Sequence, residues 1–129
     1  MKISDKEIEA VSKLEPLERY QYFMKKVADT EKMYSLVDKE GNFALSDVEI
    51  NVLFSLWPAP EFALKCAQGA WEGFTVKEIT IEDFEDNILD IVSDNNLLIN
   101  LFSIECKTGF VVDFGEFARD LSHELKKYH

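Results

Sequence analysis

A nearly continuous apolar run, Asn51 to Trp57, constrains the fold of this chain more than any other segment. Its sequence, NVLFSLW, has the length of a strand, and Pro58 and Pro60 end it. A run with so little polar alternation is typical of a strand that is buried on both faces, so we expect a central strand. A sheet that contains such a strand needs helices packed on it.

Helical periodicity predicts two helices before this strand. Ser4 and Glu7 have the spacing of a capping box, and apolar residues at helical spacing follow them. This first helix should end before Pro16, which itself suits the first turn of a second helix. We expect the second helix to end near Thr30.

Three more helices are expected after the central strand. The first covers residues 61–68, and the last begins after Asp113 and runs to the C-terminus. Between them, Thr80 has the position of a cap for a helix that continues to about residue 94. The apolar positions of that middle helix are Ile81, Phe84, Ile88, Ile91 and Val92.

The remaining strand-forming segments complete one sheet. They are residues 32–38, 42–46, 77–80, 97–104 and 110–112, and the turn at 39–42 predicts that 42–46 pairs back on 32–38 as a hairpin. The 129 residues should form a single domain, 1–129. We predict an α+β fold with a single mixed, largely antiparallel sheet, helices packed on it, two N-terminal helices and a C-terminal helix.

The charge of the chain limits its partners. The net charge of −11 opposes binding to nucleic acid or to an anionic membrane and favours a basic protein partner. No apolar run reaches the roughly 18 residues of a membrane span, and the first residues lack the apolar stretch of a signal peptide. We therefore expect a cytoplasmic protein, a monomer or weak dimer, in which Cys66 and Cys106 are reduced, buried thiols.

Residues that carry chemistry are scarce. The two histidines, His123 and His129, lie at the C-terminal end, and His123 falls off the apolar stripe of the last helix. The sequence has no zinc-type cysteine pair, no nucleophile elbow and no glycine-rich phosphate loop. Carboxylates are abundant, but nothing selects two of the 25 acids as a catalytic pair. We therefore expect no catalytic residues, no cofactor and no metal, and no enzyme activity.

The acidic side chains gather in the C-terminal part of the chain. Residues 78–129 contain four basic and 12 acidic side chains, and the stretch 78–94 contains seven acids and no base. Four acids should project away from the apolar stripe of the middle helix and bind a partner: Glu82, Glu85, Asp86 and Asp90. The alternative is an ordinary solvated helix surface, whose first-turn acids favour the positive end of the helix dipole. Like charges held close along a helix cost stability that a purely structural role would not require, which is the argument for the partner-binding hypothesis.

Two tryptophans are the second candidate for partner binding. Trp57 and Trp71 flank the helix expected at 61–68. They either cover the sheet, as large aromatic side chains commonly do, or act as partly exposed anchors in an interface. A pocket beside them would instead indicate a small-molecule sensor or a small enzyme.

Four segments of the chain carry a family resemblance. WPAPEFA (57–63) and CAQGAWEGF (66–74), with RYQYF (19–23) before them and IEDF (81–84) after them, resemble DUF2750, a family of bacterial domains of unknown function. The resemblance covers the chain from about residue 19 to the last helix. It implies a bacterial, cytoplasmic protein with a compact α+β fold, and no catalytic residues. The order of elements is also similar to the N-terminal domain of the SseB (enhanced serine sensitivity) family.

These likenesses suggest a function at the level of the fold alone. Small acidic bacterial domains of SseB-like architecture recur among immunity proteins, which neutralise toxins. The leading hypothesis is therefore a non-enzymatic immunity protein that binds a basic toxin, for example a nuclease, through an acidic face.

Overall fold

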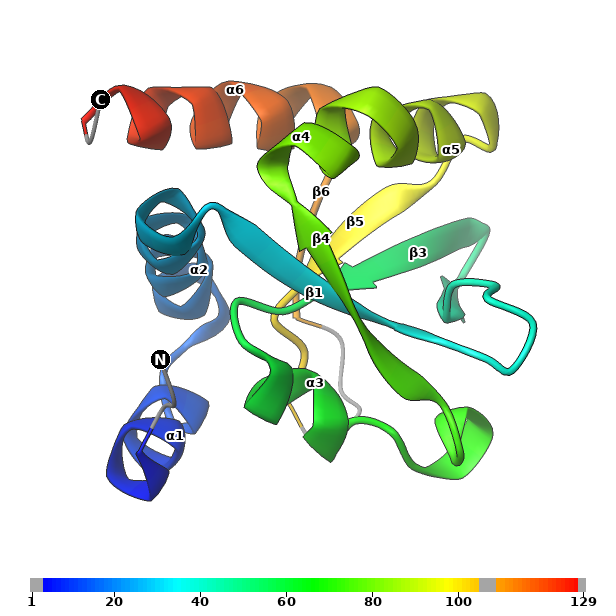
Figure 1. The fold of residues 1–129 in the computed structure, drawn as a ribbon, viewed down its shortest axis with the longest axis horizontal. Helices are drawn as coiled ribbons and strands as arrows, with labels where there is room; N and C mark the ends of the chain where they lie inside the picture. The colour runs from blue at the N-terminus through cyan, green and yellow to red at the C-terminus, as the bar shows by residue number, and fades with distance from the viewer. Residues whose placement is uncertain (1–3, 105–108, 128–129) are drawn as a thin grey trace.

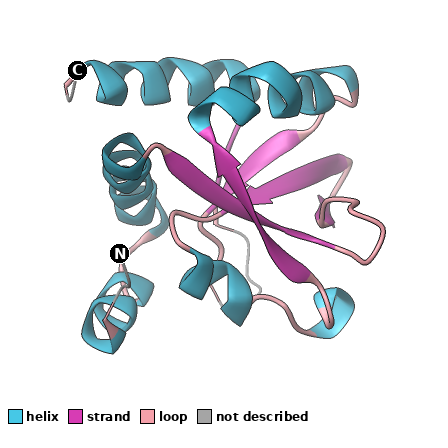
Figure 2. Ribbon diagram, in the orientation of Figure 1, coloured by secondary structure: helices cyan, strands magenta, loops and turns pink. Residues whose placement is uncertain are grey.

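Strands form the middle of the molecule, and helices cover them on several sides (Figure 2). The structure is a computed structural model, and it describes residues 4–104 and 109–127. It confirms the predicted α+β class, with helices before, between and after the strands (Figure 1). In chain order the elements are α1 (Asp5–Ser12), α2 (Pro16–Thr30), β1 (Lys32–Val37), β2 (Leu45–Val48), β3 (Asn51–Leu56), α3 (Pro60–Lys65), η1 (Gly69–Trp71), β4 (Thr75–Thr80), α4 (Ile81–Asp83), η2 (Phe84–Ile88), α5 (Leu89–Asp94), β5 (Leu98–Leu101), β6 (Phe110–Val112) and α6 (Phe114–Lys126).

Local signals define the ends of the helices. The Ser4 side chain accepts a hydrogen bond from the Glu7 backbone N–H at 3.2 Å, as the capping box predicts. α2 begins at Pro16 and ends at Thr30, also as predicted. Before α6, the Asp113 side chain accepts a hydrogen bond from a backbone N–H at 2.7 Å. Each of these caps satisfies a backbone donor that the helix itself leaves unpaired.

The strands form two ladders. The four-stranded sheet has the order β2-β3-β5-β6, in which β3 and β5 are parallel and the other pairs are antiparallel. The second ladder is the antiparallel pair of β1 and β4. A bridge between Tyr34 and Trp57, with backbone hydrogen bonds of 2.9 and 2.8 Å, joins the two ladders. The pairing is mixed and largely antiparallel, as predicted, but the predicted single sheet is divided in two.

The division follows from the pairing of β3. Its residues 51–54 pair with β2 at one edge, and its residues 53–56 pair with β5. Trp57, just after β3, forms an isolated bridge with Tyr34 of β1, and Pro58 has no N–H with which to extend that pairing. Residues 53–57 are all buried, so the apolar run is the central strand that the sequence predicts.

The predicted hairpin between residues 32–38 and 42–46 is wrong for most of its length. Val37 and Phe43 form a single bridge across the turn. Beyond it, β2 pairs with β3, which follows after a two-residue turn at 49–50. A two-residue loop closes a strand pair at low entropic cost, so β2 takes its neighbour in sequence on the C-terminal side as its partner.

The hydrophobic core lies between the strands and the helices. Its largest fully buried side chains include Trp57, Phe23, Phe54, Phe62, Phe84, Phe102 and Phe117. Within the described part of the chain, each helix is too short or too polar to span a bilayer.

Candidate functional site

The acidic stretch forms one continuous helical segment over residues 81–94. The segment begins after Thr80, whose side chain accepts a hydrogen bond from the Asp83 backbone N–H at 3.0 Å. α4 passes into the π-helical turn η2, and η2 continues as α5. The predicted helix is therefore confirmed, with a wider turn in its middle. Such turns are rare and occur frequently at functional sites.

An apolar face attaches this segment to the core. Phe84, Ile88 and Val92 are buried, and the Phe84 ring lies 5.2 Å from the Phe117 ring of α6, centroid to centroid. Ile91, which the sequence placed on the same face, is 37% exposed. A π-helical turn contains more residues than an α-helical turn, so the buried positions recur at every fourth residue and Ile91 falls beside them.

The opposite side of the segment carries the predicted acids. The acidic face consists of four exposed side chains: Glu82, Glu85, Asp86 and Asp90. In residues 4–104 and 109–127, none of these four carboxylates forms a salt bridge. The acid at the start of the cluster, Glu78, does form one: its Oε1 lies 3.7 Å from Lys32 Nζ. The acidic face therefore presents four negative charges that no cation of the described residues contacts.

The two tryptophans lie together. Trp57 is fully buried, and its indole N–H donates a hydrogen bond to the Ser103 carbonyl oxygen at 2.9 Å. Trp71, in η1, is partly buried and packs edge-on against Trp57 with ring centroids 6.3 Å apart. Trp57 lies inside the hydrophobic core. Of the two tryptophans, therefore, only Trp71 has exposed surface that a partner can contact.

The acidic face and η1, which contains Trp71, lie at opposite ends of β4 (Figure 1). This strand leads from η1 to the start of α4 and contains six residues. At about 3.3 Å per residue it spans about 20 Å. The six residues predicted to bind a partner therefore divide into the acidic face, the exposed part of Trp71, and the buried Trp57.

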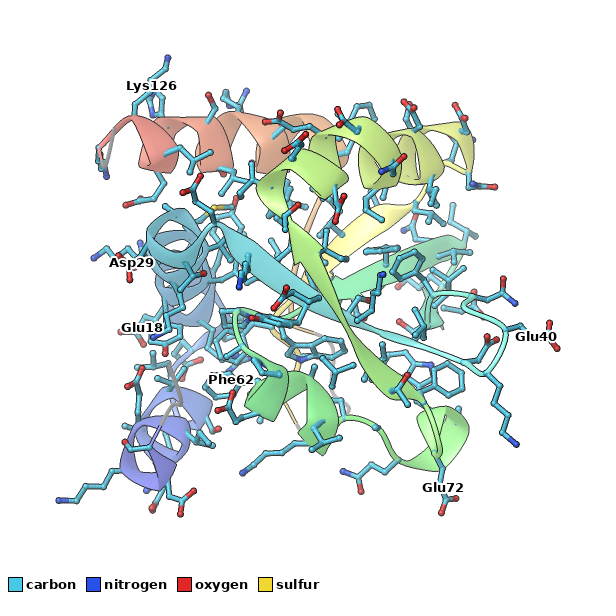
Figure 3. The ribbon with its side chains drawn as sticks, in the orientation of Figure 1. Glu18, Asp29, Glu40, Phe62, Glu72 and Lys126 are labelled. Carbon is cyan, nitrogen blue, oxygen red and sulfur yellow. The ribbon has the colours of Figure 1, made fainter. Side chains whose placement is uncertain are left out.

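A cavity of about 770 Å³ lies between α1 and α3. Its lining includes the buried side chains of Phe62, Cys66 and Ser103. Figure 3 shows Phe62 on the side of α3 that faces the N-terminal helices. Neither tryptophan lines this cavity. No sequence signal points to it, because α1 and α3 meet only in the folded chain.

Arg19 anchors the backbone beside this cavity. Its Nε donates a hydrogen bond to the Phe102 carbonyl oxygen at 3.1 Å, and its Nη1 donates to the Leu14 carbonyl oxygen. Burial lowers the pKa of Arg19, and the nearby Glu15 opposes that shift. Phe102 has a left-handed conformation, with φ 61°, and is followed by Ser103 of the cavity. The buried guanidinium thereby fixes a strained part of the chain at the cavity wall.

The other chemistry-bearing residues do not gather into a site. His123 is exposed on α6, as predicted. Cys66 is buried, also as predicted, and its Sγ donates to the Ser103 carbonyl oxygen at 3.5 Å. Cys106 and His129 lie outside the described residues. Within the described ranges, no three histidine, cysteine or acidic side chains come together as metal ligands would.

A family model matches residues 20–121, and the family is described as "Protein of unknown function (DUF2750)". The match covers well over half of the chain. The chain belongs to the DUF2750 family. This membership confirms the resemblance seen in the sequence, whereas the likeness to SseB stays a prediction. No curated protein matches the chain.

The DUF2750 match includes some of the candidate residues and not others. The acidic face, both tryptophans and α3 lie within residues 20–121, whereas α1 and Arg19 precede them. One wall of the cavity therefore belongs to the DUF2750 range, and the α1 wall lies outside it.

Proposed function

We propose that this DUF2750 protein is a non-enzymatic protein-binding module that binds a basic partner through its acidic face. Its most concrete form is a bacterial immunity protein that acts in the cytoplasm and neutralises a basic toxin, for example a nuclease. The observation that carries the proposal is the exposure of all four acidic-face carboxylates, none of which is ion-paired in the described part of the chain.

The spacing of the acids suits the basic groove of a nuclease. Glu82 and Asp90 are eight residues apart, or about 12 Å along a helix at about 1.5 Å per residue. Four charges over this length give about one negative charge per 4 Å, close to the one charge per about 3.4 Å of a DNA strand. A cationic groove that binds phosphates can therefore accept this row of carboxylates, and long-range attraction speeds the encounter.

The alternative function, a small-molecule sensor or enzyme with a pocket beside Trp57 and Trp71, has less support. Trp57 is fully buried, and neither indole lines the cavity between α1 and α3.

The test measures association with a basic toxin encoded beside the gene for this protein. We compare the wild type with the double variant Glu85→Lys/Asp86→Lys in stopped-flow association over a series of salt concentrations. The matched control is Glu40→Lys/Glu72→Lys, which makes the same charge change at exposed positions far from the acidic face (Figure 3).

The acidic-face variant should associate about tenfold more slowly at low salt and should lose most of the salt dependence. The control should change both quantities much less, because its charges lie outside the proposed interface and salt screens charges that are far apart. Protection against the toxin's activity should fall in parallel with association. Equal effects of the two double variants would remove the acidic face from the proposed function.

A further inference from the structure

We propose that the cavity between α1 and α3 binds a zwitterion of the amino-acid class: a free amino acid or a short peptide that carries an apolar side chain. The volume of about 770 Å³ lies within the range of about 300–1,000 Å³ that is usual for ligand sites. The cavity is lined by α1 and α3, and these helices lie on the opposite side of the strands from the helical segment that carries the acidic face (Figure 1). Ligand binding here is therefore a separate property from the binding of a basic protein.

Apolar side chains and a hydroxyl group line the inner part of the cavity. Ile8 is 7% exposed and Phe62 is 1% exposed, so both are held firmly by the core. The Phe62 ring is fixed by Phe102, with ring centroids 4.6 Å apart. These buried side chains form a fixed floor beneath the cavity, and the partly exposed Ile104 supplies apolar surface that a hydrophobic side chain of a ligand can contact.

The Ser103 hydroxyl supplies a polar group in this apolar surface. Ser103 is 3% exposed and lines the cavity. Its hydroxyl oxygen lies 3.9 Å from Cys66 Sγ, a long contact with a weak partner. Within residues 4–104 and 109–127 the hydroxyl has no shorter hydrogen bond, so it keeps hydrogen-bonding capacity for a ligand. A polar group of a peptide or amino acid can use this capacity, whereas a hydrocarbon cannot.

The two walls of the cavity carry opposite charge. Asp5 and Glu9 of α1 and the following Lys13 line the cavity, and Lys13 Nζ lies 3.3 Å from Glu9 Oε1, so the described residues of this wall have a net charge of −1. Lys65 gives the α3 wall a charge of +1. All four side chains belong to exposed residues and so lie at the rim.

This charge pattern selects the ligand class. An anion at Lys65 would face Asp5 and Glu9, in a chain with a net charge of −11, and a cation at Asp5 would face Lys65. A ligand with one charge of each sign satisfies both walls. Its ammonium group would lie at Asp5 and its carboxylate at Lys65, while its apolar side chain contacts Ile104, a partly exposed apolar residue of the lining.

Calorimetry with leucyl-leucine, leucine and a capped analogue tests the proposal. N-acetyl-leucyl-leucine amide has the same apolar side chains as leucyl-leucine and no charged ends, so it is the matched control. We expect leucyl-leucine or leucine to bind at millimolar concentration or below, and the capped peptide to bind at least tenfold more weakly. The relative affinities of leucine and leucyl-leucine distinguish a free amino acid from a peptide. Absence of binding by both leucine and leucyl-leucine, or equal binding of the capped peptide, overturns the proposal.

A pair of lysine variants locates the site. Lys65→Gln should raise the Kd of the zwitterion about tenfold, because it removes a charge-assisted hydrogen bond. Lys77→Gln makes the same change at an exposed position on β4 and should leave the Kd unchanged. Backbone NMR shifts on adding the ligand should centre on Ser103 and Lys65. Equal Kd values for the two variants, or shifts centred elsewhere, would place the ligand outside this cavity and refute the assignment.

Discussion

Gly109, just before β6, is the position at which this fold should tolerate a methyl group least. A Cβ atom added there would lie 2.2 Å from the Leu101 carbonyl oxygen and 2.9 Å from both the Phe102 carbonyl carbon and the Ser103 nitrogen. All three neighbours are backbone atoms, so no side chain can rotate away to make room. Replacement of Gly109 by alanine therefore requires the backbone beside β5 and β6 to separate.

The free-energy cost of Gly109→Ala has two parts. The Cβ must move from 2.2 to at least 3.0 Å from the Leu101 oxygen, a displacement of 0.8 Å in a packed region, and overpacking of this kind costs about 1–3 kcal/mol. The displacement also disrupts the 2.7 Å hydrogen bond from the Gly109 N–H to Oδ1 of the buried Asn100, whose loss costs about 1–3 kcal/mol. We expect the free energy of unfolding to fall by about 3 kcal/mol, which lowers Tm by roughly 10 °C in a chain of this length.

Urea denaturation of matched alanine variants measures this cost. The control is Gly115→Ala in the first turn of α6, where the added Cβ meets only Asp113 Oδ1, at an ordinary distance of 3.5 Å. Alanine is the better helix former, so Gly115→Ala should leave the free energy of unfolding unchanged or raise it by up to about 1 kcal/mol. If Gly109→Ala were as stable as Gly115→Ala, the close approach of Gly109 to Leu101 would be refuted.

Two other perturbations test buried polar groups. Arg19→Met leaves the carbonyl oxygens of Phe102 and Leu14 without the guanidinium donor. The free energy of unfolding, measured by urea denaturation, should therefore fall by about 2–4 kcal/mol. An unchanged value would mean that water replaces the donor at no cost. Burial, together with a hydrogen bond to Asp120, raises the pKa of Tyr20 well above its usual 10.0. Because the folded-state pKa is the higher one, this stabilisation is fully present below pH 10 and is lost as the pH rises toward the folded-state value. The free energy of unfolding should therefore fall above pH 10 in the wild type and fall less in Tyr20→Phe, and equal slopes would contradict the raised pKa.

The features that short segments determine were predictable from the sequence. The caps at Ser4, Thr80 and Asp113 each depend on a side chain and a backbone N–H three residues away, so the pattern alone identifies them. The buried strand at 51–56 follows from its own apolar run. The exposed positions of the acidic face follow from helical periodicity, although the π-helical turn, which moves Ile91 toward solvent, has no comparable local signal.

The features that depend on contacts between distant segments were not predictable. The choice of β3 rather than β1 as the partner of β2 depends on which strand edge remains available. The hydrogen bond from Arg19 to Phe102 joins residues 83 positions apart. The cavity forms only when α1, α3 and the segment at Ser103 come together. No motif in any one of these segments indicates that it will contact the other two.

The sign of the acidic face, more than its exposure, favours a docking role. The face contains three like-charged pairs at i,i+3 or i,i+4 spacing, Glu82 with Glu85, Glu82 with Asp86, and Asp86 with Asp90, which together cost about 1 kcal/mol. Burial of Phe84, Ile88 and Val92 contributes about 1.5–3 kcal/mol each, so the segment stays folded in spite of the repulsion. A solvated surface needs only polar residues, and a face of mixed sign would be equally soluble and more stable. Fold stability and solubility therefore account for the exposure of these four side chains, whereas the proposed attraction of a cationic surface would account for their uniform negative charge.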